Sequence, residues 1–222
     1  LSVVVLAAGE GKRMRSRTPK VLHPVAGQPM LAHVLEAART LEPAAIHVIH
    51  GHGGEAVRAG FPDADLRWVH QAERLGTGHA VRQALPHIPD DHQVLVLCAD
   101  VPLIRARTLR RLVDAAADGV SVLTVSLGDA TGYGRILRAA DGRIQGIVEE
   151  KDATPAQRAI REINTGLLCL PARALRGWLE ALDTGNAQGE YYLTDCIALA
   201  HDAGLAVEPV VCDDPSEVQG VN

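Results

Sequence analysis

The sequence has few aromatic residues, no excess of positive charge and no long apolar run. Aromatic side chains make up 3% of the 222 residues and hydrophobic residues 47%, so we expect a large core of aliphatic side chains. The 27 acidic residues outnumber the 22 basic ones, which gives a formal net charge of −5. This balance argues against the broad basic surface of a nucleic-acid-binding protein. No apolar run is long enough to cross a membrane, so we expect no membrane partner.

Cysteine is scarce, and the four cysteines form no C-x-x-C pair. They are Cys98, Cys169, Cys196 and Cys212. We predict reduced thiols in the core of a cytoplasmic protein. The chain lacks an initiator Met and a signal-peptide pattern and starts directly in a strand-like run, from which we expect a trimmed piece of such a protein.

The most informative stretch is the first predicted strand together with the loop that follows it. The apolar run Val3–Leu6 is typical of a strand buried on both faces of a parallel sheet, and Gly9 and Gly11 follow it. A glycine-rich loop after such a strand places backbone N–H groups at the carboxyl edge of the sheet, where α/β folds bind ligands. The loop is rich in cations that suit a triphosphate, namely Lys12, Arg13, Arg15, Arg17 and Lys20. We predict a nucleotide-binding loop.

Two common phosphate-binding loops are excluded by position. A Walker A loop needs glycine where Leu6 stands and Ser or Thr where Arg13 stands. A dinucleotide-binding loop needs a third glycine where Met14 stands, which makes a dehydrogenase a weak alternative. The remaining pattern, Leu-Ala-Ala-Gly-x-Gly-x-Arg-Met followed by Pro19-Lys20, resembles the signature of sugar-1-phosphate nucleotidyltransferases.

Strand-like and helix-like patterns alternate along the chain, which predicts an α/β fold with a doubly wound, mostly parallel Rossmann-like sheet. The predicted strands cover 3–6, 45–50, 66–69, 93–98, 120–125, 133–138, 143–148, 165–170 and 206–211. The predicted helices cover 30–40, 54–60, 77–85, 109–116, 172–182 and 195–204, and Thr154 and Thr194 are predicted N-caps. The second half is more mixed, so we expect one domain with two lobes that face a cleft.

Polar residues stand where predicted strands end. Asp100 follows the apolar run 94–98, where a carboxylate suits Mg²⁺, although an N-cap or turn aspartate is an equal alternative in isolation. Gln71 follows another strand, and its amide offers a donor and an acceptor to a base edge, although such residues are more often solvated. Gly76 and Thr77 follow it closely. The ten histidines, His50 and His52 among them, have no evident role.

Eight stretches together are more specific than the first loop alone. They are Leu6–Met14, Pro19–His23, Gln71–His79, Thr131–Ile136, Ile147–Ala153, Glu162–Gly166, Asn186–Asp195 and Glu217–Asn222. In these stretches, and over essentially its whole length, the chain resembles the uridylyltransferase domain of the bacterial bifunctional N-acetylglucosamine-1-phosphate uridylyltransferase/glucosamine-1-phosphate acetyltransferase family. The resemblance implies a nucleotide-diphospho-sugar transferase fold with a small mixed sugar-binding lobe.

The resemblance also implies site residues. Those implied to hold the nucleotide and its triphosphate are Leu6, Ala8, Gly9, Arg13, Lys20, Gln71 and Gly76. Those implied to contact the sugar or its acetamido group are Thr77, Gly134, Glu149 and Asn164. Asp100 and Asn222 are implied to ligate Mg²⁺ beside the substrates, and Arg13, Lys20 and Asp100 are implied to be catalytic. From the residues alone, Glu149 could equally belong to a solvated charge run.

The implied reaction joins two small-molecule substrates, UTP and N-acetylglucosamine-1-phosphate, into UDP-N-acetylglucosamine and pyrophosphate without a covalent nucleophile. We expect residues 1–222 to form one nucleotidyltransferase domain, in which 1–125 mainly bind the nucleotide and 126–222 mainly the sugar. The family continues into a C-terminal left-handed β-helix that carries acetyl transfer and forms a homotrimer. Because residues 1–222 hold no hexapeptide repeat, we expect them to be monomeric alone.

One departure and two alternatives accompany the resemblance. Cys98 and Ala99 stand where the family usually has Tyr or another residue and then Gly, and we expect the Ala99 methyl group to crowd the sugar. The chain could be a related transferase for another base or sugar, such as a molybdopterin-type nucleotidyltransferase. It could also be a non-catalytic nucleotide-sugar binding module. Such modules typically lose the metal aspartate or the triphosphate cations, so Asp100, Arg13 and Lys20 favour an enzyme.

Overall fold

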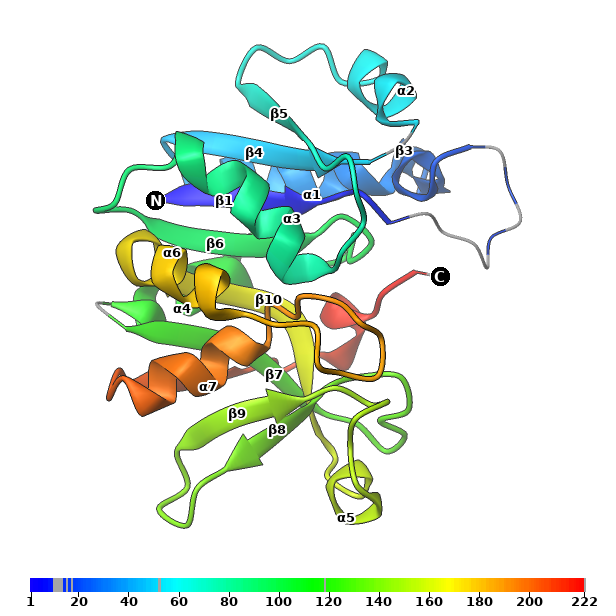
Figure 1. Ribbon diagram of the computed structural model, residues 1–222. Coiled ribbons are helices and arrows are strands. Elements are labelled where there is room, and N and C mark those ends of the chain that lie inside the picture. The colour runs from blue at the N-terminus through cyan, green and yellow to red at the C-terminus, as the bar shows by residue number, and fades with distance from the viewer. Residues whose placement is uncertain (10–13, 15, 17, 52, 118, 222) are drawn as a thin grey trace.

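A nine-stranded sheet runs through the centre of the computed structural model, which describes residues 1–9, 14, 16, 18–51, 53–117 and 119–221 (Figure 1). The strand order is β11-β7-β10-β6-β1-β4-β5, and the β8–β9 hairpin joins β10 through β8. The strands are β1 (Ser2–Leu6), β4 (Ala45–His50), β5 (Leu66–His70), β6 (Gln93–Cys98), β7 (Val120–Ser126), β8 (Arg135–Arg138), β9 (Ile144–Val148), β10 (Glu162–Pro171) and β11 (Val207–Val211). The α-helices are α1 (Met30–Arg39), α2 (Gly54–Ala59), α3 (Thr77–Ala84), α4 (Ala106–Ala116), α5 (Pro155–Arg158), α6 (Ala172–Ala181) and α7 (Asp195–Asp202).

The sheet is mostly parallel, as predicted, and the long strand β10 is the exception at its centre. β1 pairs in parallel with β4 and β6, and β7 pairs in parallel with β11. β10 lies between β6 and β7 and is antiparallel to both. Its register with β7 shifts between Asn164 and Leu168, where Gly166 has a φ of 83°. The first residues of β10 therefore lie at the edge where β6 and β7 end.

Helices cover both faces of the sheet, which confirms the doubly wound prediction. α1 and α4 pack on one face against side chains such as Val3 and Val5 of β1. α3, α6 and α7 pack on the other face, against side chains such as Val4. In Figure 1 these three helices lie in front of the sheet, with α1 and α4 behind it. The alternation along β1 explains why its sequence is apolar without interruption.

Short elements around residue 20 are absent from the sequence prediction. The 3₁₀ helix η2 (Lys20–Leu22) is followed by a two-stranded hairpin of β2 (Pro24–Val25) and β3 (Gln28–Pro29). No hydrophobic period is visible in segments this short, so only the tertiary packing defines them. Their effect is to bury Lys20 beside the end of β1.

The two predicted N-caps have different outcomes. Thr154 forms a capping box with Gln157, because its hydroxyl oxygen accepts from Gln157 N–H and its own N–H donates to Gln157 Oε1. Thr194 stands at the N-cap position of α7, as predicted, but its side chain makes no capping hydrogen bond. Its hydroxyl instead donates to Glu149 Oε1 at 2.9 Å.

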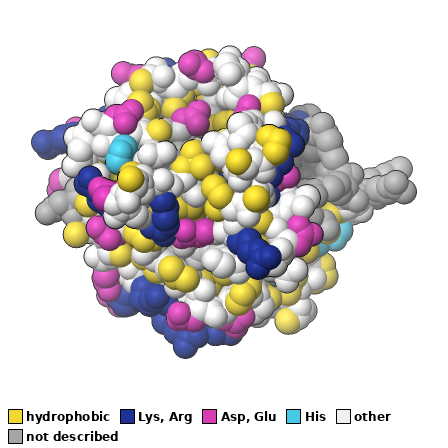
Figure 2. All heavy atoms as spheres, turned by 90° about the horizontal axis from the view of Figure 1, so that it is seen from below, with side chains coloured by type: hydrophobic (Ala, Val, Ile, Leu, Met, Phe, Trp, Pro, Cys, Tyr) yellow, Lys and Arg dark blue, Asp and Glu magenta, His cyan; other side chains and the backbone are white. Residues whose placement is uncertain are grey.

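The surface and the thiols agree with the composition. All four cysteines are unpaired, and Cys169, Cys196 and Cys212 are buried. In the part of the chain that the structure describes, every helix is too short or too polar to traverse a bilayer. On the face shown in Figure 2, basic side chains lie beside acidic ones, with hydrophobic side chains between them.

After β11, the chain returns to the carboxyl end of β6 as the C-terminal strap (residues 212–221). The strap contains the 3₁₀ helix η4 (Pro215–Val218). Near the end of the strap, Val221 N–H donates to the carbonyl oxygen of Asp100 at 2.9 Å. The strap is therefore attached directly beside Asp100.

A buried carboxylate fastens the strap to α4. Glu217 is 1% exposed and accepts from Thr108 Oγ1 at 2.6 Å and from Arg105 N–H at 3.3 Å. It also forms an ion pair with the Arg105 guanidinium at 3.0 Å. Arg105 is the N-cap of α4 and supplies no side-chain cap itself. Glu217 thus supplies, from outside the helix, an acceptor for polar groups at the start of α4.

Replacing Glu217 tests this attachment. We expect E217A to lower the free energy of unfolding in urea by about 2 kcal/mol, because the Thr108 hydroxyl and Arg105 N–H lose their acceptor. The matched control is D213N, which breaks the exposed ion pair between Asp213 and Arg111 and should cost less than about 0.5 kcal/mol. Equal losses in the two variants would contradict the account.

His47 is a buried histidine without a hydrogen-bond partner. It lies on β4 and is 0% exposed, and among the described residues neither ring nitrogen has a partner. Burial lowers the pKa of His47 to about 4, helped by the nearby Arg67 and His87. The folded protein therefore holds this ring neutral at pH values where the unfolded chain binds a proton.

This pKa predicts acid-sensitive stability. The contribution of His47 is fully present above the unfolded pKa of 6.5, and protonation of the unfolded chain removes it as the pH falls towards about 4. The total change is about 3 kcal/mol from this group. The free energy of unfolding in urea should therefore fall less between pH 7 and pH 4 for H47V than for the wild type. The half-exposed control H201Q should follow the wild type, and an unchanged slope for H47V would refute the assignment.

Candidate active site

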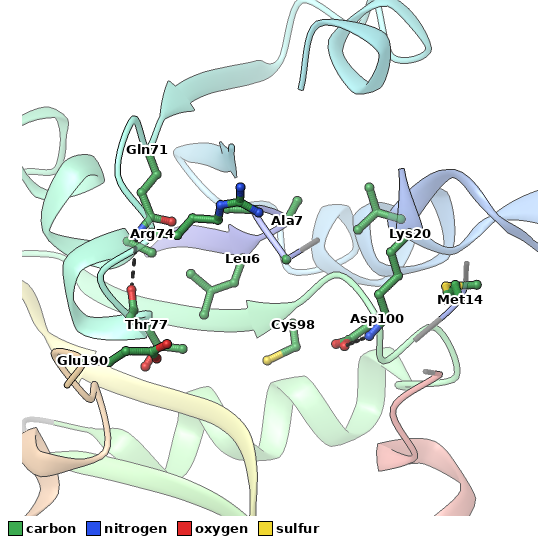
Figure 3. A pocket seen from close by; sticks show the side chains of 15 residues that line it. Leu6, Ala7, Met14, Lys20, Gln71, Arg74, Thr77, Cys98, Asp100 and Glu190 are labelled. Carbon is green, nitrogen blue, oxygen red and sulfur yellow. Dashed lines mark hydrogen bonds and ion pairs between the residues drawn. The ribbon is translucent and has the colours of Figure 1, made fainter. Parts of the chain in front are cut away.

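A cavity of about 430 Å³ opens at the carboxyl edge of the sheet, where β1, β5 and β6 end. Figure 3 shows Gln71 and Arg74 at one end of it, Lys20 and Asp100 at the other, and Leu6 and Cys98 between them. Its predicted lining residues are Leu6, Ala8, Gly9, Lys20, Gln71, Gly76, Thr77 and Asp100. Arg13 and Asn222 lie outside the described residues.

The apolar floor of the cavity comes from the end of β1. Ala7 N–H donates to Ile49 O at 2.9 Å, which continues the β1–β4 pairing one residue beyond the strand. Leu6, Ala8 and Gly9 line the cavity. A Cβ atom built on Gly9 would meet no atom within 4 Å, so space is open above this part of the loop. A flat apolar floor with an open glycine suits a base and sugar placed against the main chain.

Gln71 presents its carbonyl oxygen to the cavity. The side chain is buried, and its Nε2 donates to Gly76 O at 3.2 Å and lies 2.9 Å from His79 Nδ1. Gly76 O can only accept a hydrogen bond, so the Gln71 atom that contacts it is the amide nitrogen and not the amide oxygen. The hydrogen bonds of Gln71 engage its amide nitrogen, which leaves Oε1 to face the cavity. The site therefore offers an acceptor, rather than a choice of donor and acceptor, to a base edge.

Gly76 permits a close approach between two distant loops. Its φ is 109°, and a Cβ atom there would lie 2.6 Å from Tyr191 O. The loops join through Tyr191 N–H to Leu75 O at 2.7 Å and Gly78 N–H to Tyr191 O at 2.8 Å. Only a glycine fits this backbone conformation and this contact.

Thr77 belongs to the same junction between loops. Its hydroxyl oxygen accepts from Leu193 N–H at 3.0 Å while the residue lines the cavity. The hydroxyl is thus partly committed to holding the segment that leads to α7. Glu190, from this segment, also lines the cavity.

Lys20 and Asp100 form an ion pair inside the cavity. Lys20 Nζ lies 2.6 Å from Asp100 Oδ2, and the side chains are 8% and 32% exposed. Asp100 stands two residues after the last residue of β6, and Lys20 comes from η2. Lys20 and Asp100 neutralise each other at this wall of the cavity. A lysine is suited to bind a phosphate group, and an aspartate is suited to bind a metal ion beside that phosphate.

The neighbours of Asp100 correct one expectation. Ala99 is 0% exposed and packs in the core under α4, so its methyl group points away from the cavity that Cys98 and Asp100 line. The expected crowding of the sugar by Ala99 is wrong, because neighbouring strand residues point to opposite faces. Burial raises the pKa of the Cys98 thiol to about 12, and the Asp100 charge adds to the shift. Cys98 is therefore protonated near neutral pH and is a poor nucleophile.

A second group of predicted residues forms the Glu149 cluster (Gly134, Glu149 and Asn164). A Cβ atom on Gly134 would lie 3.3 Å from Glu149 Oε2, and Asn164 N–H donates to Gly134 O at 2.9 Å. Asn164 reaches this edge of the sheet because β10 is antiparallel to its neighbours. Burial raises the pKa of Glu149, and the hydrogen bond from Thr194 opposes this shift.

Two sets of contacts connect the cavity with the Glu149 cluster. The Cys98 thiol donates to Gly166 O at 3.7 Å, two residues after Asn164. The segment 190–194 lines the cavity with Glu190 and donates to Glu149 through Thr194. The predicted site residues that the structure describes are thus gathered at one edge of the sheet, in two connected groups.

Several lining residues escaped the sequence analysis. Arg74 and Glu190 stand in loops with no periodic pattern, and Met14 and Val21 were taken only as parts of a motif. Cys98 could have been found, because it ends the same strand that delivers Asp100. Thr194 was assigned to a helix cap, and only the fold brings it to Glu149.

For a magnesium ion, the donor set fits only together with a substrate. Among the described residues, no three His, Cys, Asp or Glu side chains come together as a metal site. Mg²⁺ characteristically takes one or two carboxylates and completes its shell with phosphate oxygens and water. Asp100 at the cavity wall meets that requirement as a single protein carboxylate.

Solved structures share the fold. A protein assigned as a glucose-1-phosphate thymidylyltransferase from Bacillus anthracis superposes with a TM-score of 0.77 at 18% identity, covering 96% of this chain and 87% of that one. A UDP-glucose pyrophosphorylase complexed with UDP-glucose gives a TM-score of 0.75 at 17% identity, covering 94% and 89%. At these identities the likeness concerns the fold alone.

Sequence relatives are much closer. The chain is 60% identical over 222 residues to the bifunctional protein GlmU of Chromobacterium violaceum and to that of Alkalilimnicola ehrlichii. All of this chain is covered, but only 49% and 48% of those proteins, so it spans about half the length of the curated relatives it matches. Residues 3–190 match the family described as the MobA-like NTP transferase domain. The chain therefore belongs to the MobA-like NTP transferase domain family.

Proposed function

We propose that the chain transfers the uridylyl group of UTP to N-acetylglucosamine-1-phosphate, forming UDP-N-acetylglucosamine and pyrophosphate. The observation that carries the proposal is the order of groups along one sheet edge. Gln71 stands at one end of the cavity and the Lys20–Asp100 pair at the other, and the Glu149 cluster is connected to the cavity through Cys98 and through the segment 190–194. The 60% identity to proteins named GlmU supports the choice of substrates.

Uracil is the base that the acceptor Gln71 Oε1 favours. The ring N3–H of uracil is a donor, whereas cytosine carries a lone pair at that position and would face acceptor against acceptor. The cavity wall on this side includes Gly76 and the small residue Ala80. The nucleotide is thus held mainly by residues of the first half of the chain, and the sugar mainly by residues of the second half.

The Glu149 cluster supplies groups for a hexosamine. Glu149 carries two acceptor oxygens, one of which already holds Thr194, and hydroxyl groups are donors that can use the other. Asn164 Oδ1 accepts from Gly166 N–H at 3.0 Å, which turns its amide nitrogen outward as a donor for an acetamido or hydroxyl oxygen. Both side chains are fixed by protein contacts before a sugar enters.

Transfer needs positioning and charge neutralisation rather than a protein nucleophile. A phosphate oxygen of the sugar-1-phosphate attacks the α-phosphorus of UTP in line, a new P–O bond forms, and the bond to the bridging oxygen breaks as pyrophosphate leaves. Lys20 gives up its ion pair with Asp100 and then neutralises charge on the phosphates. Arg13 is proposed to share this task. Asp100 and Asn222 would hold Mg²⁺, which supplies Lewis-acid stabilisation of the same charge when bound.

The first prediction is the reaction itself. Pyrophosphate release should occur with UTP, N-acetylglucosamine-1-phosphate and Mg²⁺, and should depend on all three. Rates with CTP, ATP and GTP should be at least about tenfold lower, which corresponds to about 1.4 kcal/mol. Turnover of CTP equal to that of UTP would refute the role of Gln71. Activity with another sugar phosphate alone would favour a related transferase, and nucleotide binding without turnover would favour a binding module.

The second prediction concerns Asp100. D100N should lower kcat by about 10²-fold or more and raise the Mg²⁺ concentration for half-maximal rate, because the amide loses the ionic contact to the cation. The matched control is D91N, in the exposed turn before β6, at the opposite end of the same strand. It should behave as the wild type in both measurements. A D100N enzyme with wild-type Mg²⁺ dependence would show that Asp100 has only a structural role.

A further inference from the structure

One arginine lies in the interior between the three segments that carry the Glu149 cluster. Arg135 is the first residue of β8 and follows Gly134 directly, yet its side chain is only 2% exposed. A guanidinium is charged at every physiological pH, so burying it costs several kcal/mol unless its donors are paired. The motif that contains it, Thr131–Ile136, has a role in the proposed function only through Gly134.

The donors of Arg135 reach each segment. Nε donates to Ile160 O at 3.0 Å, and Nη2 to Arg158 O at 3.4 Å, at the end of α5. Nη1 donates to Tyr133 O. Nη2 also forms an ion pair with Glu150 Oε2 at 2.7 Å. One planar group thus joins main chain at Tyr133 and at 158–160 to the side-chain carboxylate of Glu150.

Each of these contacts is close in sequence to a member of the Glu149 cluster. Tyr133 precedes Gly134, Glu150 follows Glu149, and Ile160 is four residues before Asn164. β8 also pairs with β9 through Arg135 and Val148, and with β10 through Arg135 and Ile163. The backbone at position 135 and its side chain therefore fix the same three segments.

The position of the Glu149 carboxylate depends on how these three segments are held. Its carboxylate lies beside Gly134, where an added Cβ atom would come within 3.3 Å of Oε2, and it accepts from Thr194. A shift of a few tenths of an ångström in the Glu149–Glu150 turn would change the distance to Gly134 and to any bound hydroxyl group. Substrate positioning at this scale affects binding and rate strongly.

We propose that Arg135 is a positioning residue for the sugar phosphate, which holds Gly134, Glu149 and Asn164 in their relative places without touching the substrate. The inference rests on the proposed function, since it assigns the sugar to the Glu149 cluster. The fork of five donors is required, because a lysine supplies one point charge and cannot reach the carbonyl oxygens of two segments and the Glu150 carboxylate together.

The test separates the two substrates. R135K should raise the KM for N-acetylglucosamine-1-phosphate at least about tenfold, while the KM for UTP changes less than about twofold. The nucleotide cavity lies on other elements, so a general loss of folded protein would lower kcat and leave both KM values unchanged. E150Q, which removes the charged partner and keeps the arginine, should raise the same KM by a smaller factor and provides the test if R135K does not fold.

The matched control is R143K. Arg143 precedes β9 and forms an ion pair with Asp141 at 2.7 Å, but its side chain is exposed and this contact stays within the turn between β8 and β9. It should leave both KM values within about twofold of the wild type.

Three results would overturn the inference. They are equal changes in both KM values for R135K, a wild-type KM for the sugar phosphate in R135K, and an effect of R143K as large as that of R135K. If R135K does not fold, a wild-type KM for the sugar phosphate in E150Q would overturn the inference. A wild-type enzyme without activity on this sugar phosphate would instead refute the proposed function, so the two failures are distinguishable.

Discussion

The antiparallel insertion of β10 between β6 and β7 is the constraint on which the site depends. In a purely parallel sheet, every strand would bring its last residues to the ligand-binding edge. β10 brings its first residues there, so Asn164 lies beside the strand that delivers Asp100. The bulge between Asn164 and Leu168 lets Gly166 O meet the Cys98 thiol, which joins the two groups of site residues. The β8–β9 hairpin, with Gly134 and Glu149, attaches to the same strand.

Charge is arranged around this constraint so that each buried ionic group has a defined partner. Lys20 holds Asp100 within the cavity, Arg135 holds Glu150 beneath the Glu149 cluster, and Glu217 holds Arg105 under the strap. Each pair costs desolvation, and such pairs contribute more to geometry than to stability. Each also lies next to the site rather than in the aliphatic core. The Lys20–Asp100 pair differs from the other two, because a polyanion and a cation can replace its partners.

Much of the fold followed from the sequence because β1 and β6 carry uninterrupted apolar runs that only a doubly covered sheet can bury. The direction of β10 did not, since its apolar pattern is the same in either direction. Site residues at strand ends, such as Asp100 and Gln71, could be predicted from position. The hydroxyl of Thr194 and the guanidinium of Arg135 could not, because their partners are distant in sequence and only the tertiary fold brings them together.

The central claim is a single direct transfer within one cavity, with no protein nucleophile. The stereochemistry at the α-phosphorus tests it most directly. With the Sp diastereomer of UTPαS and N-acetylglucosamine-1-phosphate, one in-line displacement inverts the configuration at the thiophosphate, which ³¹P NMR of the product can establish. The account predicts inversion, because burial keeps the Cys98 thiol protonated and the attacking oxygen comes from the second substrate. Retention of configuration would require two successive displacements through a nucleotidylated side chain and would contradict it.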